Sequence, residues 1–197
     1  MFDKSDFIAG RPCLDFVNTV GGLRGAVANE KLNAYADLLE WAHVGGFVTK
    51  AQFDALKREA NEHPGHAEKV LKRAILLREA MHDAFKTLIK GRPPKLDHLA
   101  LINRELGEAL AHACIKKGPK GFQWDWSDEI ELDLPLWAPA RSAGELIVDI
   151  DVARLHECAG DTCGWLFLDE TRNGSRRWCD MKGCGNRAKV RRFRAQI

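Results

Sequence analysis

Hydrophobic residues recur every three or four positions through the first two thirds of the chain, which is the pattern of amphipathic helices. Segments with this spacing cover residues 30–46, 51–63, 66–90 and 96–116. Thr49 and Gln52 form a capping box before the second segment, and glycine and proline residues close all four. A fifth helix is expected over 134–150, where Pro135 and Pro139 are tolerated only near the first turn.

The spacing changes in FQWDW, where Phe122, Trp124 and Trp126 alternate with polar residues. This period of two predicts a half-buried strand. Because an isolated strand is not stable, it needs a partner, and we assign that role to RPCLDFVNT near the N-terminus. Farther along, WLFLDET and SRRWC read as strands on either side of Asn173-Gly174, a dipeptide suited to a type I′ hairpin turn.

Four of the six cysteines lie in the last quarter of the chain, as Cys158-x4-Cys163 and Cys179-x4-Cys184 separated by fifteen residues. Two such pairs brought together by a hairpin supply the four thiolates of a closed, tetrahedral zinc site. Two disulfides are the alternative in an oxidising compartment, but the N-terminus shows no secretory signal. We therefore predict one structural Zn²⁺ ion. The isolated cysteines at 13 and 114 are expected in the core.

Charge is distributed unevenly along the chain. Residues 171–197 carry a net charge of +8 and the preceding residues −6, which together give the overall +2. A basic tail on a mildly acidic body indicates a polyanionic partner, and the alternative is a solvated end with no partner. No uncharged apolar run approaches the roughly 18 residues of a membrane helix, so we expect a cytoplasmic protein with no membrane contact.

After Cys184 the spacing is again helical. Val190, Phe193 and Ile197 form an apolar stripe, which we expect to hold this helix against the rest of the protein, and basic residues form a neighbouring stripe. A knuckle, a hairpin and a helix that carries the last ligand in its first turn is the order of a treble-clef zinc finger. Four thiolates leave no open coordination position, so the metal is structural.

These residues also carry a family resemblance. The segment CAGDTCGWLFLDETRNGSRRWCDMKGCGNRAKVRRFR resembles the CGNR zinc finger, named for the motif that here is Cys184-Gly185-Asn186-Arg187. The stretches GRPCLDFVNT, EKLNAYADLLEWA and PLWAPARSAGELI resemble the ABATE domain that is paired with this finger. The resemblance implies a bacterial, stress-related transcription regulator whose finger binds DNA and whose N-terminal domain senses a small ligand.

The expected fold class is therefore α+β, with a mainly helical N-terminal domain over residues 1–150, a small β element, and a treble-clef finger over residues 151–197. We expect a DNA-binding transcription regulator and no enzyme, since a deaminase signature, a treble-clef nuclease histidine and a C-x-x-C redox pair are all missing from the sequence. The partner is double-stranded DNA. A single finger reads few base pairs, so specific binding favours a homodimer.

Arginine and lysine side chains of the finger are the candidate DNA contacts, because guanidinium groups suit phosphates and base edges. They are Arg172, Arg176, Arg177, Arg187, Lys189, Arg191, Arg192 and Arg194. Arg187 is equally suited to bracing the zinc loops. The finger aromatics Trp165, Phe167 and Trp178 either form its small core or stack on single-stranded bases, and the core is favoured.

The alternative function is a zinc-finger module for protein interaction or for single-stranded nucleic acid. In the N-terminal domain, polar residues within apolar surroundings are candidates for a pocket that takes an acidic ligand. They are Asp15, Asn18, Arg78 and Arg141. The alternative is a buried network in which these groups satisfy one another.

Overall fold

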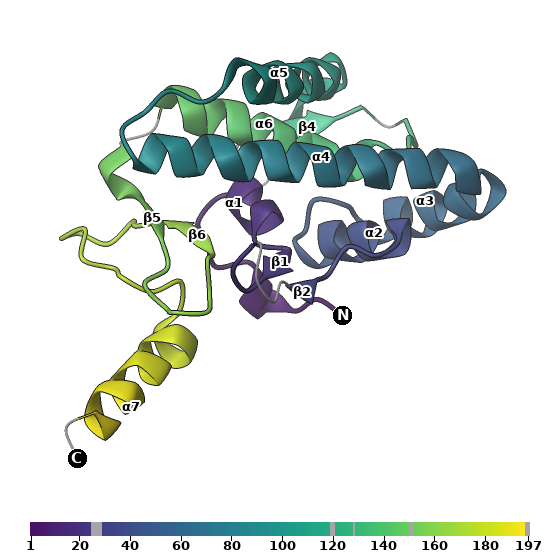
Figure 1. The fold of residues 1–197 in the computed structure, drawn as a ribbon. Coiled ribbons are helices and arrows are strands. Elements are labelled where there is room, and N and C mark those ends of the chain that lie inside the picture. Colours follow the sequence, from purple (N-terminus) through teal and green to yellow (C-terminus); the bar gives the residue numbers. More distant parts are fainter. Residues whose placement is uncertain (25–28, 119–120, 128, 150–151, 196–197) are drawn as a thin grey trace.

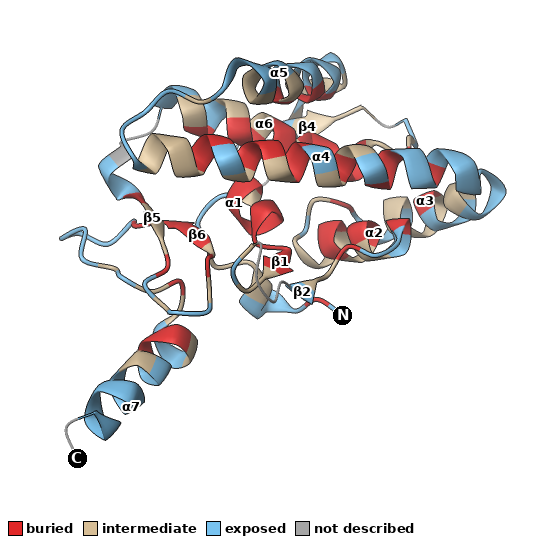
Figure 2. Cartoon of the chain, in the orientation of Figure 1, coloured by how far each residue is buried: buried red, intermediate tan, exposed pale blue. Residues whose placement is uncertain are grey.

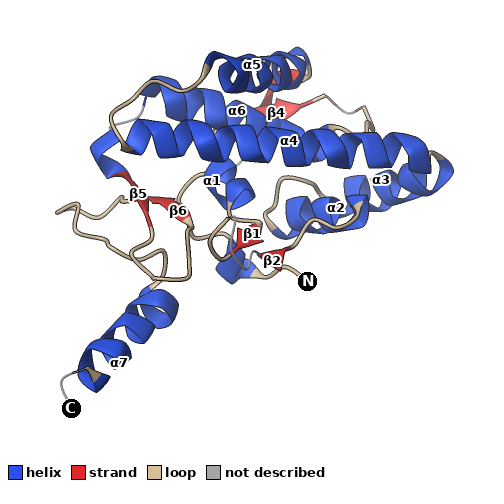
Figure 3. Cartoon of the chain, in the orientation of Figure 1, coloured by secondary structure: helices blue, strands red, loops and turns tan. Residues whose placement is uncertain are grey.

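A computed structural model of the chain describes residues 1–24, 29–118, 121–127, 129–149 and 152–195. Helices dominate as far as Asp149 (Figures 1 and 3). They are a short 3₁₀ turn at Lys4–Asp6, α1 (Pro12–Val17), α2 (Tyr35–Val44), α3 (Lys50–Glu62), α4 (Pro64–Ile89), α5 (Leu96–Ala111) and α6 (Leu134–Asp149). The predicted helical N-terminal part is thus confirmed.

Small antiparallel hairpins accompany the helices in the described part of the chain. They are β1 (Val20–Gly21) with β2 (Asn29–Glu30), β3 (Ala113–Gly118) with β4 (Gly121–Trp126), and β5 (Leu155–Glu157) with β6 (Leu166–Leu168). A 3₁₀ turn at Val152–Arg154 precedes β5, and a π-helical turn at Met181–Gly185 leads into α7 (Asn186–Arg194).

The long helix α4 runs through the middle of the molecule, with α5 and α6 on one side and α1, α2 and α3 on the other (Figure 1). Buried residues line the inner faces of these helices and continue into β5 and β6 (Figure 2). Trp41, Trp137 and Phe16 are among the largest fully buried side chains of this core, and Phe167 of β6 joins them. The favoured core role of Phe167 is therefore confirmed.

Local sequence signals place several helix ends correctly. Thr49 accepts a hydrogen bond from the amide of Gln52 at 3.3 Å, and the Gln52 side chain accepts one from the amide of Thr49 at 3.0 Å, so the predicted capping box starts α3. His63 ends α3, and Pro64 then occupies the first position of α4, where its missing amide hydrogen costs nothing.

The prediction for RPCLDFVNT was wrong, because this segment forms α1 instead of a strand. The apolar residues from Cys13 to Val17 are buried on every side, and a short run without period does not distinguish a buried helix from a strand. FQWDW does form a strand, β4, but Phe122 and Trp124 are exposed and not half-buried. Its partner is β3, with Ile115 opposite Trp124. The predicted helix over 96–116 therefore ends at Ala111, five residues early.

Two other helix predictions need correction. The helix expected over 30–46 begins only at Tyr35, because Asp37 accepts hydrogen bonds from the amides of Asn33 and Ala34 at 2.9 and 2.8 Å and so fixes the start there. In α6, Pro139 lies beyond the first turn, inside the helix, where it has no amide hydrogen to donate.

The hairpin of the finger is also built from other segments than expected. Leu166–Leu168 pairs with Leu155–Glu157, and residues 175–179 form no strand. The buried carboxylate of Asp169 accepts the amides of Thr171 at 2.8 Å and Arg176 at 2.7 Å, so a side chain closes this loop. Of the two residues of this dipeptide only Gly174 takes a positive φ, at 59°, and a type I′ turn over Asn173-Gly174 would require it of both.

Candidate metal centre and basic helix

The side chains of the four clustered cysteines lie together next to the β5–β6 hairpin. Their sulfur atoms all lie within 4.8 Å of one another. The Sγ–Sγ distance is 3.6 Å between Cys163 and Cys179, and 3.7 Å between Cys179 and Cys184. A tetrahedral Zn²⁺ ion with Zn–S bonds of 2.3 Å requires edges of about 3.8 Å. The cluster therefore has the donor set and the size of a zinc site.

The β5–β6 hairpin positions the first two ligands. Cys158 donates its amide to the carbonyl of Trp165 at 2.8 Å, and Cys163 donates its amide to the carbonyl of Gly160 at 3.0 Å. A Cβ atom at Gly160 would lie only 3.3 Å from the Cys184 sulfur, so a larger residue here would push against a ligand of the metal centre. This tight turn forms the knuckle.

The last ligand is held by a turn that Asp180 caps. Its carboxylate accepts the amides of Lys182 at 3.1 Å and Gly183 at 2.7 Å, and its carbonyl accepts the amide of Gly185 at 3.0 Å. These bonds satisfy donors at the start of the helical turn that contains Cys184. Asp180 was not among the residues singled out from the sequence, although aspartate is one of the residues preferred at the N-cap of a helical turn.

Three of these sulfurs, those of Cys158, Cys163 and Cys179, strongly affect one another's ionisation. Hydrogen bonds with Cys163 and Cys179 lower the pKa of Cys158 to about 2, whereas the hydrogen bond with Cys158 raises the pKa of Cys163 to about 12. These three thiols therefore do not all ionise by themselves, and a bound divalent cation is what holds such neighbouring ligands as thiolates. One zinc ion satisfies this requirement, and when bound it is structural.

Arg187 lies against the metal centre. Its Nη2 atom donates to the Cys184 sulfur at 3.0 Å, and this hydrogen bond raises the pKa of the guanidinium. Of the two roles open to Arg187 from the sequence, the structure shows contact with a zinc ligand, where the guanidinium offsets part of the negative charge of the thiolates.

Arg176 acts inside the protein. Its guanidinium donates to the carbonyls of Trp178 at 3.1 Å and Ile8 at 3.0 Å, forms a short hydrogen bond with the carbonyl of Cys179, and lies 4.5 Å from the ring centroid of Phe167. Its donors are thus engaged by backbone atoms from both ends of the chain. Arg176 therefore acts as a brace between the metal centre and the N-terminal segment. Because its donors are already engaged there, we no longer count it among the candidate phosphate contacts.

The remaining basic residues of the finger are exposed. All residues of α7 are exposed except Ala188, which is half-buried, and the helix projects away from the body (Figure 1). Arg191 forms an ion pair with Asp161 of the knuckle. The expectation that Val190 and Phe193 anchor α7 was wrong, because their exposed fractions are 49% and 66%. Ile197 lies outside the described residues.

The four pocket candidates of the N-terminal part do not come together. Arg78 is buried and paired with Glu30 at 2.7 Å and Glu79 at 2.8 Å. The Asp15 carboxylate accepts the amide of Ala9 at 2.9 Å. Asn18 bonds to the backbone of β6, and Arg141 lies elsewhere, on α6. Three of the four are thus satisfied within the protein, but by other groups and not by one another, so they do not form the mutual network that was the alternative. Glu30, the partner of Arg78, was not among the residues singled out from the sequence.

Comparison with known protein families agrees with this architecture. Residues 10–150 match the ABATE profile, described as "Putative stress-induced transcription regulator", and residues 154–196 match the CGNR zinc finger. The chain belongs to the ABATE family. A search of curated proteins found no match. The family description is that of a transcription regulator, and the second match adds a zinc finger to this ABATE protein.

No helix in the described part of this ABATE chain is both long and apolar enough to cross a membrane.

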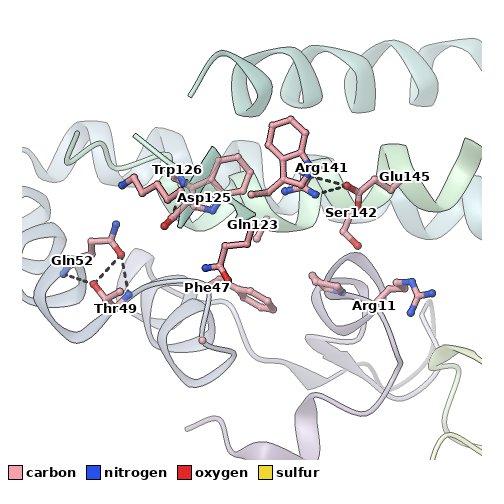
Figure 4. Close-up of a pocket in the computed structure, with 15 residues that line it drawn as sticks. Arg11, Phe47, Thr49, Gln52, Gln123, Asp125, Trp126, Arg141, Ser142 and Glu145 are labelled. Atoms are coloured by element: carbon pink, nitrogen blue, oxygen red, sulfur yellow. Dashed lines mark hydrogen bonds and ion pairs between the residues drawn. The ribbon is translucent and has the colours of Figure 1, made fainter. Parts of the chain in front are cut away.

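The ABATE part contains a cavity of about 660 Å³ between α6, β4 and the loop from α2 to α3 (Figure 4). Arg141 lines it, with its guanidinium paired to Glu145 at 2.7 Å and 4.8 Å from the ring centroid of Trp124. Trp126 and Gln123 line the same cavity.

Proposed function

We propose that this transcription regulator binds double-stranded DNA through its finger, with α7 as the main contact. One observation carries this proposal: a helix with five cations and no acid projects from a zinc-centred support with nearly all of its surface exposed. Lys189, Arg192 and Arg194 have no ion pair within the described residues, so their charges are available for phosphate groups. Exposed Arg172 and Arg177 extend the basic surface onto the preceding loop.

Electrostatics supports a polyanionic partner. A zinc tetrathiolate carries two negative charges, which reduces the +8 of residues 171–197 without reversing it. Arg187 faces this charge directly, so the outer cations of α7 are left to define the field outside the finger. Contacts from such cations to phosphates release counterions, and binding must then weaken steeply with salt.

Fluorescence anisotropy with a labelled duplex tests the proposal. If about five phosphates are neutralised, log K should fall with log salt with a slope of about −4.5. The variants Lys189→Gln and Arg192→Gln should each reduce the magnitude of that slope by about one, whereas Arg58→Gln on exposed α3 should leave it unchanged. A slope near zero, or a complex that survives both heparin and moderate salt, would instead indicate an apolar protein-interaction surface.

Zinc dependence and sequence preference are tested together by selecting bound duplexes from a random pool. Cys184→Ser should abolish enrichment because it removes a ligand from the support of α7. A nine-residue helix reads only a few base pairs, so we also propose that the specific complex contains two copies of the chain on paired half-sites. The number of chains per selected duplex, measured by native mass spectrometry, tests this stoichiometry.

We further propose that the cavity beside Arg141 binds a small, planar, anionic ligand. Its volume lies in the range of small-molecule sites, Trp124 and Trp126 offer flat apolar walls, and a ligand carboxylate can replace the exposed carboxylate of Glu145 on Arg141. Arg11 at the edge of the cavity pairs with Glu170 of the finger at 2.7 Å, which connects the cavity with the DNA-binding part.

Calorimetric titration with benzoate and with uncharged benzamide tests this ligand class. Benzoate should bind more tightly than benzamide, and the difference should disappear in Arg141→Gln but persist in Arg92→Gln, a change at an exposed residue. Where binding is coupled, saturating benzoate changes the affinity for DNA by the same factor by which DNA changes the affinity for benzoate. Equal affinities for the two probes would contradict an anion site at Arg141.

A further inference from the structure

The outer face of α7 carries a short ridge of uncharged residues. Asn186, Val190 and Phe193 stand at positions i, i+4 and i+7 and so share one face of the helix. The exposed fractions of Val190 and Phe193 are 49% and 66%. Half-buried Ala188 lies on the opposite side, so the ridge points away from the body of the protein.

Cations flank this ridge on both sides. At about 100° per residue, Lys189 and Arg192 fall on one flank, while Arg187, Arg191 and Arg194 fall on the other. The side chain of Asn186 makes no hydrogen bond with any residue that the structure describes. The helix therefore presents an uncharged centre between two basic edges.

This arrangement matches the cross-section of a DNA major groove. The groove is about 12 Å wide and admits one α-helix, with base edges on its floor and phosphates along both walls. A helix of nine residues is about 13 Å long, enough to cover a few base pairs. With the ridge on the floor, Lys189 and Arg192 on one flank and Arg194 on the other face the two phosphate backbones.

Resting on the proposed binding of duplex DNA, we propose that α7 is a major-groove recognition helix that selects A·T base pairs. The amide of Asn186 is suited to the paired acceptor and donor of adenine, N7 and N6. Val190 and Phe193 offer apolar surface to the C5 methyl groups of thymine, which no other DNA base carries. Lys189, Arg192 and Arg194 contact phosphates and set the position of the helix without reading sequence.

The test compares duplexes of equal length and charge with the zinc-loaded full chain at one salt concentration. One duplex contains A·T pairs, one contains G·C pairs, one has uracil in place of thymine, and one has 7-deazaadenine in place of adenine. The A·T duplex should bind about tenfold more tightly than the G·C duplex. Uracil removes only the methyl group and 7-deazaadenine removes only the N7 acceptor, so each should lose several-fold in affinity.

Two variants assign these losses to residues. Phe193→Ala should abolish the difference between thymine and uracil, and Asn186→Ala the difference between adenine and 7-deazaadenine, while both retain the salt slope of the parent chain. Phe122→Ala is the matched control, because Phe122 is an exposed phenylalanine on β4 with an exposed fraction of 82%. Zinc content and circular dichroism verify that each variant is folded.

The outcomes separate the two proposals. Absence of binding to every duplex overturns the proposed DNA binding and therefore also the proposed selection of A·T base pairs by α7. Salt-dependent binding with equal affinity for all four duplexes supports DNA binding and overturns the readout. A preference for A·T that ignores uracil and 7-deazaadenine also overturns it, because a narrow minor groove then explains the selectivity.

Discussion

Asn18, at the end of α1, forms two hydrogen bonds with the backbone of Leu166 in the finger. Its Nδ2 atom donates to the carbonyl oxygen at 2.8 Å, and its Oδ1 atom accepts from the amide at 2.9 Å. Together with the bond from the amide of Leu168 to the carbonyl of Ala9 at 2.8 Å, this pair joins β6 to the N-terminal part. The finger is thus attached to the N-terminal part by hydrogen bonds to the buried backbone of β6.

Asn18→Ala should lower the free energy of unfolding by about 2–4 kcal/mol, because it leaves both backbone groups of Leu166 buried without a partner. Urea unfolding followed by circular dichroism measures the loss. Asn103→Ala on exposed α5 is the control and should change stability by no more than about 0.5 kcal/mol. A loss of stability as small as that of the control would show that water replaces the hydrogen bonds of the Asn18 side-chain amide.

Cys184→Ser should eliminate stoichiometric zinc binding and unfold the finger, since a structural site of this kind supplies about 10–16 kcal/mol of apparent binding free energy. Zinc content measured by mass spectrometry and the fluorescence of Trp165 and Trp178 report the change. Cys114→Ser in half-buried β3 should keep one zinc ion per chain. Retention of full zinc by the first variant would mean that three sulfurs are enough.

Arg176→Lys should destabilise the chain by about 1–3 kcal/mol, because an ammonium group cannot reach the separate carbonyls of Ile8, Trp178 and Cys179 at once. Thermal unfolding measures this effect. The paired substitution Arg172→Lys, at an exposed position of the same loop, should be neutral. If both variants were equally stable, the brace would contribute nothing beyond a positive charge.

Burial raises the pKa of Asp15 to about 7 in the folded protein, against about 3.9 in an unfolded chain. The folded state therefore binds the proton more tightly, and the contribution of Asp15 to stability is complete below about pH 4 and lost as the pH rises to about 7. Asp15→Asn should remove this loss and be more stable than the parent at pH 8, by up to about 4 kcal/mol.

The comparison of the two chains across pH supplies the check. The difference in free energy of unfolding should shrink steadily between pH 7 and pH 4, where both side chains are neutral. A difference that is constant with pH would show that the carboxyl of Asp15 titrates as it does in water, and any gain in the variant would then come from the hydrogen bond with Ala9.

Features that depend on local chemistry were predictable from the sequence. The cap formed by Thr49 and Gln52 needs only neighbouring residues, and the cysteine spacing alone indicated the cluster that the structure confirms. Features decided by tertiary contacts were not. Segments as short as α1 and β3 carry too little periodicity to be assigned from the sequence, so the pairing of β4 with β3 could not be predicted from the pattern of either segment.

The finger shows the same difference between features set by neighbouring residues and features set by tertiary contacts. The sequence suggested a turn at Asn173-Gly174, but the side chain of Asp169 competes for the backbone of that loop and removes the second strand. The apolar stripe on α7 was interpreted as an anchor because periodicity shows which residues share a face and not what that face meets. Exposure of Val190 and Phe193 is information that only the folded chain contains.

The hairpin of β5 and β6 limits how far this finger can be treated as a transferable module. Leu155, Leu166 and Phe167 are almost completely buried, and their packing includes the core of the ABATE part. A fragment cut before β5 would expose these side chains to water even with its metal in place, and it would tend to aggregate. Transplanting the proposed DNA contacts to another protein would therefore require grafting the surface of α7 alone, because the finger depends on the ABATE part as its scaffold.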